Sequence, residues 1–244
     1  GPDIVSRGFV YVRESDELMD EARQLAGKGI KELILVAQET TVYGKDLYGE
    51  KSLHKLLREL CKISGIQWIR ILYCYPEEIY DELIQTIKEE NKVCHYLDLP
   101  IQHASDAVLK RMGRRTSKAQ LVEIIEKLRK EIPDISLRTT LITGFPGETQ
   151  EQHEELKDFV DEMEFDRLGV FTYSPEENTP AAEMADQVPE EVKEERRDEL
   201  MELQQEISYD KGQDRIGQEL LVMIEGKVAD ENAYVGRTYK DAPN

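Results

Sequence analysis

Cysteine is scarce in this sequence, and its three occurrences, Cys61, Cys74 and Cys94, lie far apart along the chain. Short metal-binding motifs place successive ligands about two to four residues apart, so this spacing matches no such motif. An odd number of cysteines without an export signal also disfavours a disulfide framework. We therefore expect three cysteines that pack in the core of a protein kept in a reducing cytosol.

Long apolar runs are missing as well. No stretch approaches the ~18 consecutive apolar residues that a transmembrane helix requires. No signal peptide opens the chain. The sequence therefore predicts a cytoplasmic protein that makes no contact with a membrane.

Positive charge is in deficit, because 32 Lys and Arg residues stand against 51 Asp and Glu residues and the formal net charge is −19 at pH 7. An acidic surface repels the phosphate backbone, which makes nucleic acid an unfavourable partner. The same charge also keeps a protein soluble without any specific partner. Charge alone therefore narrows the choice of partner without identifying one.

Common catalytic and nucleotide-binding motifs are absent. The sequence contains no P-loop, no GxGxxG fingerprint, no HExxH pair and no EF-hand loop. Its four histidines are scattered and suggest no Ser–His–Asp arrangement, and only His103 lies near the polar residues discussed below. The catalytic residues thus remain unknown, and an ordinary enzyme acting on a small metabolite is disfavoured.

The sequence does contain a repeated alternation of strand-like and helix-like segments. Strands are expected at 8–12, 32–37, 68–73, 95–99, 136–143 and 167–173, and helices at 16–27, 52–63, 77–90, 106–112, 117–131 and 149–163. This order implies a parallel sheet with right-handed crossovers. An open, doubly wound sheet and a curved, barrel-like sheet both fit. In the barrel, function would lie at the C-terminal ends of the strands.

The pattern changes after the sixth strand. A long charged helix is expected over 189–213, with Leu200, Leu203 and Ile207 as its apolar seam. Short strand-like segments at 219–224 and 233–236 follow it. We therefore expect a first domain over 1–214 and the start of a small all-β domain over 215–244.

Polar residues gather just beyond the predicted strands, which indicates a polar site at one edge of the sheet. An arginine inside an apolar strand needs a carboxylate or a ligand, so Arg138 is the most informative of them. Each of the others also has a simpler role as a loop cap or turn former. The set comprises Gln38, Glu39, Gln102, Arg138, Thr140, Tyr173 and Ser174, with the loop 144–148 after the fifth strand.

The connection between the first strand and the first helix is unusually short. The strand runs into Glu14, and Ser15 is already suited to cap the helix. Strand-to-helix loops typically contain ~2–6 residues, and an enzyme of this plan should have a long one here. A loop has therefore either been deleted between Glu14 and Ser15 or been left out of the recorded chain.

Four stretches resemble the radical S-adenosylmethionine methylthiotransferase family. They read KELILVAQETTVYG at 31–44, YLDLPIQH at 96–103, LRTTLITGFPGET at 137–149 and FTYSPEENTPAA at 171–182. Residues 186–192 favour the RimO branch, and 234–243 resembles the start of its TRAM domain. The resemblance covers nearly the whole chain.

This resemblance implies a partly open, six-stranded (βα) radical SAM barrel followed by a truncated, all-β TRAM domain. It implies a 4Fe-4S cluster, S-adenosylmethionine and a reducing electron donor, with a methylthio group added to an aspartate of the small-subunit ribosomal protein S-twelve. The alternatives are a methylthiotransferase acting on tRNA adenosine, as in the MiaB branch, and a non-catalytic ribosome-associated binding module.

Carried over by position, the resemblance also assigns a site. Gln38 and Glu39 match the place where the family meets the methionine end of the cofactor. The residues expected beside that region or against the adenine are Gln102, Arg138, Thr140, Ile142, Phe171, Tyr173 and Ser174.

The chain departs from the family at its cluster site. The CxxxCxxC motif is expected in the loop missing between Glu14 and Ser15, and the N-terminal domain that carries a second cluster is also missing. The chain as written therefore has no metal ligands. Because thiolates hold such clusters, it would be inactive in radical chemistry.

Overall fold

The computed structural model describes residues 7–11 and 13–243. The chain divides into two compact units, one formed by residues 1–98, 128–136 and 218–244, the other by residues 99–127 and 137–217. No helix among the described residues combines the length and the apolarity needed to cross a bilayer.

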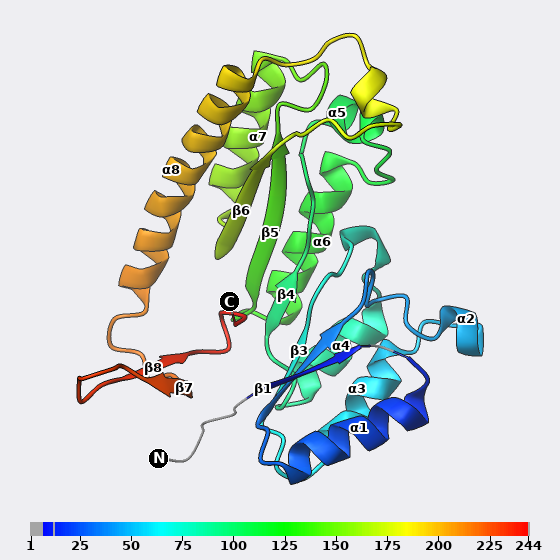
Figure 1. Ribbon diagram of the computed structural model, residues 1–244, viewed down its shortest axis with the longest axis vertical. Helices are drawn as coiled ribbons and strands as arrows, with labels where there is room; N and C mark the ends of the chain where they lie inside the picture. Colours follow the sequence, from blue (N-terminus) through cyan, green and yellow to red (C-terminus); the bar gives the residue numbers. More distant parts are fainter. Residues whose placement is uncertain (1–6, 12, 244) are drawn as a thin grey trace. The chain divides into compact units, whose positions relative to one another are not determined.

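The first unit is built on a parallel sheet of β1 (Arg7–Tyr11), β2 (Glu32–Val36) and β3 (Trp68–Ile71), in that order. Three helices cover one face of this sheet, namely α1 (Ser15–Gly27), α3 (Leu53–Cys61) and α4 (Asp81–Glu89) (Figure 1). Leucines recur at the helical period along α3 and are all buried: Leu53, Leu56, Leu57 and Leu60. The predicted alternation of strands and helices is confirmed here.

β4 (Tyr96–Asp98) continues this parallel arrangement beside β3. The Cys94 amide donates to the Ile69 carbonyl at 2.9 Å, and the Cys74 amide donates to the Asp98 carbonyl at 3.0 Å. Both cysteines are buried in the core, as expected.

The start of α1 differs from the expectation. Glu14, not Ser15, is the N-cap residue, and no side chain caps the helix. The Leu18 amide already donates to the Glu14 carbonyl at 3.1 Å, so the helix begins directly after Glu14. The Ser15 amide donates instead to the Tyr48 hydroxyl at 3.2 Å. Tyr48 belongs to α2 (Lys45–Tyr48), a short helix that the sequence pattern did not reveal.

The second unit pairs β5 (Ser136–Thr143) with β6 (Arg167–Thr172) in parallel. Residues 99–102 run along β5, since the Leu99 amide donates to the Arg138 carbonyl and the Gln102 amide donates to the Thr140 carbonyl. The other helices are α5 (Asp106–Arg111), α6 (Lys118–Glu131), α7 (Gln150–Met163) and α8 (Glu190–Asp214). α7 and α8 lie side by side (Figure 1).

The inner face of α8 is only partly apolar. Leu200 and Ile207 are buried as predicted, whereas Leu203 is half-buried. Three polar side chains, Lys193, Arg196 and Gln204, share the buried face. Gln204 Nε2 donates to the Phe165 carbonyl at 2.8 Å, so hydrogen bonds as well as apolar contacts hold this helix.

The C-terminal residues form an antiparallel hairpin of β7 (Met223–Lys227) and β8 (Tyr234–Arg237). Its first strand begins at Met223, later than the expected residue 219. The hairpin belongs to the first unit, where the Tyr239 carbonyl accepts from Arg70 Nη1 at 2.7 Å. A separate small domain beginning near residue 215 stays a prediction.

Candidate functional site

The predicted cofactor residues of β5 lie on one face of the strand. Arg138, Thr140 and Ile142 are half-exposed, while the alternate residues 137, 139, 141 and 143 are buried. Alternate side chains of a strand point to opposite faces, so these three side chains share a face. Arg138 is thus half-exposed in a strand whose other face is buried, and its role at the site stays a prediction.

A glycine of β6 opens space on this face. Gly169 stands opposite Thr140 in the sheet, and Phe171 stands opposite Ile142. A Cβ atom at Gly169 would lie 3.6 Å from Arg138 Nη2, 3.8 Å from the Phe171 ring and 3.9 Å from Thr140 Oγ1. Three side chains thus converge over a residue that has no side chain.

The chemistry of this face suits an adenosyl group. The Phe171 side chain is 60% exposed, so its ring is available to a flat aromatic base, and Ile142 adds apolar surface. The Thr140 hydroxyl and the Arg138 guanidinium add hydrogen-bonding groups. We call Arg138, Thr140, Ile142, Gly169 and Phe171 the ligand face.

Gln102 lies at the edge of this face in an unusual backbone conformation. Its φ is 70°, a left-handed value that non-glycine residues seldom adopt. Its amide donates to the Thr140 carbonyl, and its carbonyl accepts from the Ile142 amide, both at 2.9 Å. The two bonds join Gln102 to the two ligand-face residues of β5 that neighbour it.

A fully buried hydrogen bond between His103 and Glu148 lies directly after Gln102 in the chain. His103 Nε2 lies 2.6 Å from Glu148 Oε2, and neither side chain is exposed. His103 Nδ1 accepts from the Ser105 amide at 3.0 Å, so the ring hydrogen is on Nε2 and points at the carboxylate. Glu148 Oε1 accepts from the Gly144 amide at 2.9 Å and from Arg196 Nη1 at 2.8 Å.

These donors control the charge of Glu148. Burial alone would raise the pKa of its carboxyl, but the hydrogen bonds and charges of its neighbours outweigh burial and lower the pKa from its ordinary value. Glu148 is therefore an ionised, buried carboxylate that joins the chain after Gln102 to the loop after β5 and to α8.

The two predicted residues beyond β6 are placed differently. The Tyr173 ring packs edge-on against Phe145, with centroids 5.3 Å apart, and its carbonyl accepts from Lys193 Nζ at 3.0 Å. The Tyr173 hydroxyl is buried and has no hydrogen-bond partner among the described residues. Ser174 is exposed in the following loop. Neither residue contributes to the space over Gly169.

Gln38 and Glu39 lie in the first unit, just after β2. Glu39 Oε1 accepts from the Thr41 amide at 3.0 Å and from the Thr41 hydroxyl, and Oε2 accepts from the Tyr75 amide at 2.8 Å. Burial raises the pKa of Glu39, and the two backbone hydrogen bonds partly offset this effect. Glu39 thus joins the segments that follow β2 and β3, while the Gln38 side chain is exposed.

The cysteines do not fit an iron–sulfur cluster. Cys61 is on α3, Cys74 follows β3 and Cys94 precedes β4, and no group of potential metal ligands among the described residues contains a cysteine. Burial raises the pKa of Cys61 and of Cys94 to about 12, and raises that of Cys74 well above its ordinary value. Cluster ligands are thiolates, so these protonated, separated thiols cannot replace the missing motif.

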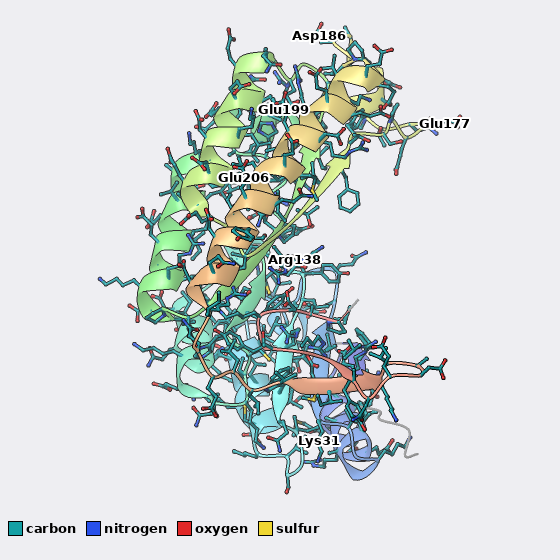
Figure 2. The ribbon with its side chains drawn as sticks, turned by 90° about the vertical axis from the view of Figure 1, so that its left-hand side faces the viewer. Lys31, Arg138, Glu177, Asp186, Glu199 and Glu206 are labelled. Carbon is teal, nitrogen blue, oxygen red and sulfur yellow. The ribbon has the colours of Figure 1, made fainter. Side chains whose placement is uncertain are left out.

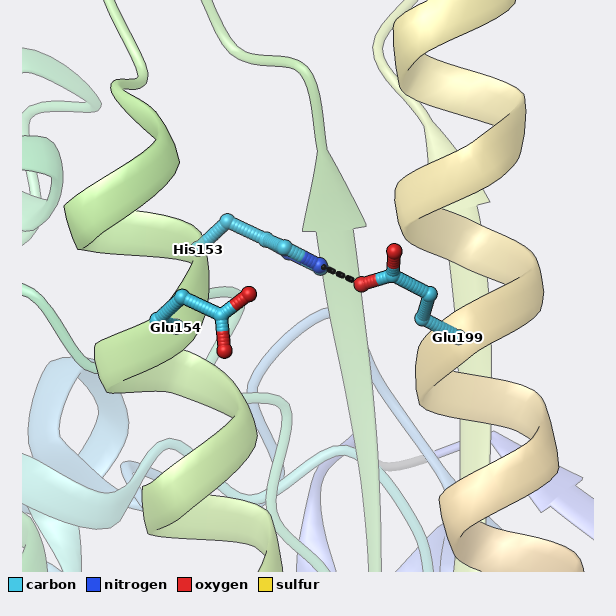
Figure 3. Close-up of side chains that lie close together, drawn as sticks. All are labelled: His153, Glu154 and Glu199. Atoms are coloured by element: carbon cyan, nitrogen blue, oxygen red, sulfur yellow. Dashed lines mark hydrogen bonds and ion pairs between the residues drawn. The ribbon is translucent and has the colours of Figure 1, made fainter.

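One cluster of potential metal ligands joins α7 to α8, but it is already satisfied. His153 Nε2 lies 2.7 Å from Glu199 Oε2, with Glu154 close by (Figure 3). Lys157 Nζ lies 3.3 Å from Glu199 and 3.7 Å from Glu154, so a cation already balances both carboxylates. Glu199 and Glu206 are labelled on α8 in Figure 2. We assign this cluster to helix packing.

Sequence reasoning missed Gly169 and the Glu148 network. A glycine inside a strand signals close approach by another group, and this signal was present in the sequence. The contact of Glu148 with His103 spans 45 residues, and no local pattern encodes such a pairing.

Comparison with known proteins shows the family of this chain. Residues 2–160 match the model of the radical SAM superfamily, and the chain belongs to that superfamily. It is 64% identical over 229 residues to the ribosomal protein uS12 methylthiotransferase RimO of Lachnoclostridium phytofermentans, covering 94% of this chain and 52% of that protein. The protein of the same name from Clostridium perfringens is 56% identical over 238 residues, covering 98% and 53%.

The chain therefore spans about half the length of the curated relatives that it matches. Among solved structures, the radical SAM enzyme coproporphyrinogen III oxidase from Escherichia coli is similar with a TM-score of 0.60 at 20% identity, covering 83% of this chain and 52% of that one. The methyltransferase TsrM from Kitasatospora setae, solved with cobalamin and a [4Fe-4S] cluster, has a TM-score of 0.54 at 16% identity, covering 68% and 36%. These likenesses show the fold, and the predicted α/β radical SAM fold is confirmed, while the TRAM domain stays a prediction.

Proposed function

We propose that this chain is the S-adenosylmethionine-binding barrel of a methylthiotransferase that modifies an aspartate of ribosomal protein uS12. The ligand face carries the proposal, because it combines an exposed aromatic ring, a hydroxyl and a guanidinium over a glycine. The substrate is proposed from the similarity to two proteins that are named ribosomal protein uS12 methylthiotransferases. The net charge of −19 supports a basic protein partner over nucleic acid.

In this proposal, the residues of the chain bind and orient the nucleoside. Phe171 and Ile142 would contact the adenine, Thr140 and Gln102 would offer hydrogen bonds, and Arg138 would hold polar groups beside them. Gln38 and Glu39 are carried over from the family by position alone, as residues expected at the methionine end of the cofactor. When bound, S-adenosylmethionine supplies the adenosyl and methyl groups.

The residues present do not fit the 4Fe-4S cluster on which the superfamily relies, so no reaction step is assigned to it here. This observation favours a second candidate, a non-catalytic module that binds the nucleoside and a ribosomal partner. The two candidates differ in one respect, which is whether the fold becomes active once cluster ligands are supplied.

The test inserts a loop carrying CxxxCxxC between Glu14 and Ser15, followed by anaerobic reconstitution and iron counting. We expect about four irons per chain with the loop and none without it. The loaded protein, supplied with a reductant, a sulfur source and S-adenosylmethionine, should add the mass of one methylthio group to a peptide of ribosomal protein uS12. Modification of tRNA adenosine instead would favour the alternative substrate. Full cluster loading without any product would favour the binding module.

A further inference from the structure

Helix α8 lies beyond residues 2–160, the part of the chain that matches the superfamily, yet it places two cations inside the second unit. Lys193 and Arg196 are only 3% and 7% exposed. Buried cations are rare unless they make specific bonds. Both side chains donate hydrogen bonds to residues of the segments that follow β5 and β6.

Arg196 acts on the buried carboxylate. Its Nη1 donates to Glu148 Oε1 at 2.8 Å and to the Glu148 carbonyl at 3.0 Å. The same carboxylate accepts from the Gly144 amide and from His103, the residue that follows Gln102. A continuous series of hydrogen bonds thus runs from α8 to the edge of the ligand face.

Lys193 acts on the neighbouring backbone. Its Nζ donates to the Tyr173 carbonyl at 3.0 Å, and its own carbonyl accepts from the Thr143 hydroxyl at 3.1 Å. A Cβ atom added at Gly144 would lie only 2.1 Å from Lys193 Cγ, so the lysine stem occupies the space over that glycine. α8 therefore contacts the C-terminal ends of both β5 and β6.

The backbone held in this way is unusual. Gln102 and Gly144 have φ values of 70° and 72°, both in the left-handed region. Glycine adopts this conformation freely, whereas in Gln102 it is strained and persists only where surrounding contacts fix it. His103 and Glu148 supply such contacts, and Arg196 in turn balances the charge of Glu148.

We propose that α8 positions the ligand face, with Arg196 acting through Glu148 and His103 on Gln102 and Gly144, and Lys193 acting on Tyr173. Both cations are positioning residues, since neither is part of the ligand face. This inference rests on the proposed binding of an adenosyl group there. It makes α8 a functional part of the nucleoside site and not merely a packing element.

The test measures the affinity of the whole chain for S-adenosylhomocysteine by calorimetry, at a temperature where every variant is folded. Arg196→Met should weaken binding about tenfold or more, as is common when a group that orients ligand-binding residues is lost. Arg196→Lys should restore most of the affinity, because a single nitrogen makes both bonds to Glu148 and an ammonium can replace it. Lys193→Met keeps an unbranched apolar side chain over Gly144 and should also weaken binding. It is the second test of the proposal if Arg196→Met fails to fold.

Glu199→Gln is the matched control. Glu199 lies one turn further along α8, and the substitution removes the charge that contacts His153 and Lys157 on α7 without changing a group at the strand ends. Its affinity should equal that of the unmodified chain even where it lowers the melting temperature. Equal weakening by Glu199→Gln and Arg196→Met would overturn the proposal, as would unchanged binding in Arg196→Met and Lys193→Met.

Hydrogen exchange separates this inference from the proposed function. Arg196→Met should speed exchange at the Gln102, Ile142 and Gly144 amides, and Glu199→Gln should not. One outcome is that the unmodified chain fails to bind S-adenosylhomocysteine while Arg196→Met still speeds exchange at these amides. That outcome would reject the proposed nucleoside site and would support the positioning of these residues by α8. If Arg196→Met leaves exchange at these amides unchanged, the proposal that α8 positions them is rejected, whatever affinity is measured.

Discussion

Arg70 Nε donates to Glu32 Oε1 at 2.9 Å, and both side chains are completely buried between β2 and β3. The pair does not stand alone, because Arg237 of β8 also binds Glu32 and reaches Glu225 of β7. The Arg70 guanidinium lies 4.6 Å from the centre of the Tyr96 ring. A buried charge network therefore ties the C-terminal hairpin to the sheet of the first unit.

Replacing Arg70 with Met should lower the free energy of unfolding by about 3–5 kcal/mol, because Glu32 loses a buried partner. Denaturant unfolding followed by circular dichroism measures this change. Arg58→Met, which removes exposed pairs with Glu89 and Glu90, should cost less than about 1 kcal/mol. Similar losses in the two variants would contradict the assignment of Arg70 to a buried network.

The stability contributed by Glu148 should depend on pH. The folded pKa of its carboxyl lies below the ordinary value of 4.5, so its contribution is present above that pH and is lost as the pH falls through the folded pKa. Glu148→Gln should lower the melting temperature near pH 7, since an amide cannot accept from all of its donors. The difference from the unmodified chain should shrink progressively below pH 4.5. A difference that stays constant down to strongly acidic pH would show that the carboxylate charge is not responsible.

Two glycines make a matched pair for substitution by alanine. Gly144→Ala should cost about 1–3 kcal/mol, because φ is 72° and the new Cβ would meet Lys193. Gly212→Ala, within α8 with nothing near its Cβ, should instead gain about 0.5–1 kcal/mol from helix propensity. Thermal unfolding of both variants checks the opposite signs. A neutral Gly144→Ala would mean that the loop after β5 relaxes freely.

The three thiols should react slowly in the folded chain. Cys74 and Cys94 are buried, and burial together with Glu90 raises the pKa of Cys61 to about 12. An aromatic disulfide reagent at mildly alkaline pH should therefore label the folded chain slowly and label three thiols rapidly in guanidinium chloride. Rapid labelling of the folded chain would indicate a reactive thiolate and reopen the question of a metal site.

Local patterns were sufficient to predict most of the fold. The leucines of α3 and the alternating residues of β5 have clear periods, and these elements lie where the sequence places them. Ser15 misled the prediction because its side chain makes no cap and its amide binds Tyr48, a residue 33 positions away. Start and stop signals depend on such distant contacts, which periodicity does not record.

The candidate site likewise contains features that a local sequence pattern predicts and features that depend on distant contacts. The placement of Thr140 and Ile142 on one face follows from strand alternation, and their resemblance to a known family suggested the ligand. The alternation also shows why Arg138 is accessible, a point that the apolar run around it concealed. Arg70 lies in another apolar run, and its partner is the buried carboxylate of Glu32. Sequence identifies an arginine that needs a partner, but only the fold identifies that partner.

The direct passage from Glu14 into α1 has a consequence for the evolution and engineering of this barrel. Arg13 and Glu14 are exposed, and the first helical hydrogen bond, from Leu18 to Glu14, forms without any loop. Closing a loop between ends that already meet costs entropy that rises only with the logarithm of its length. We therefore expect this junction to accept inserted segments with different ligand sets, which would give one scaffold different chemistries.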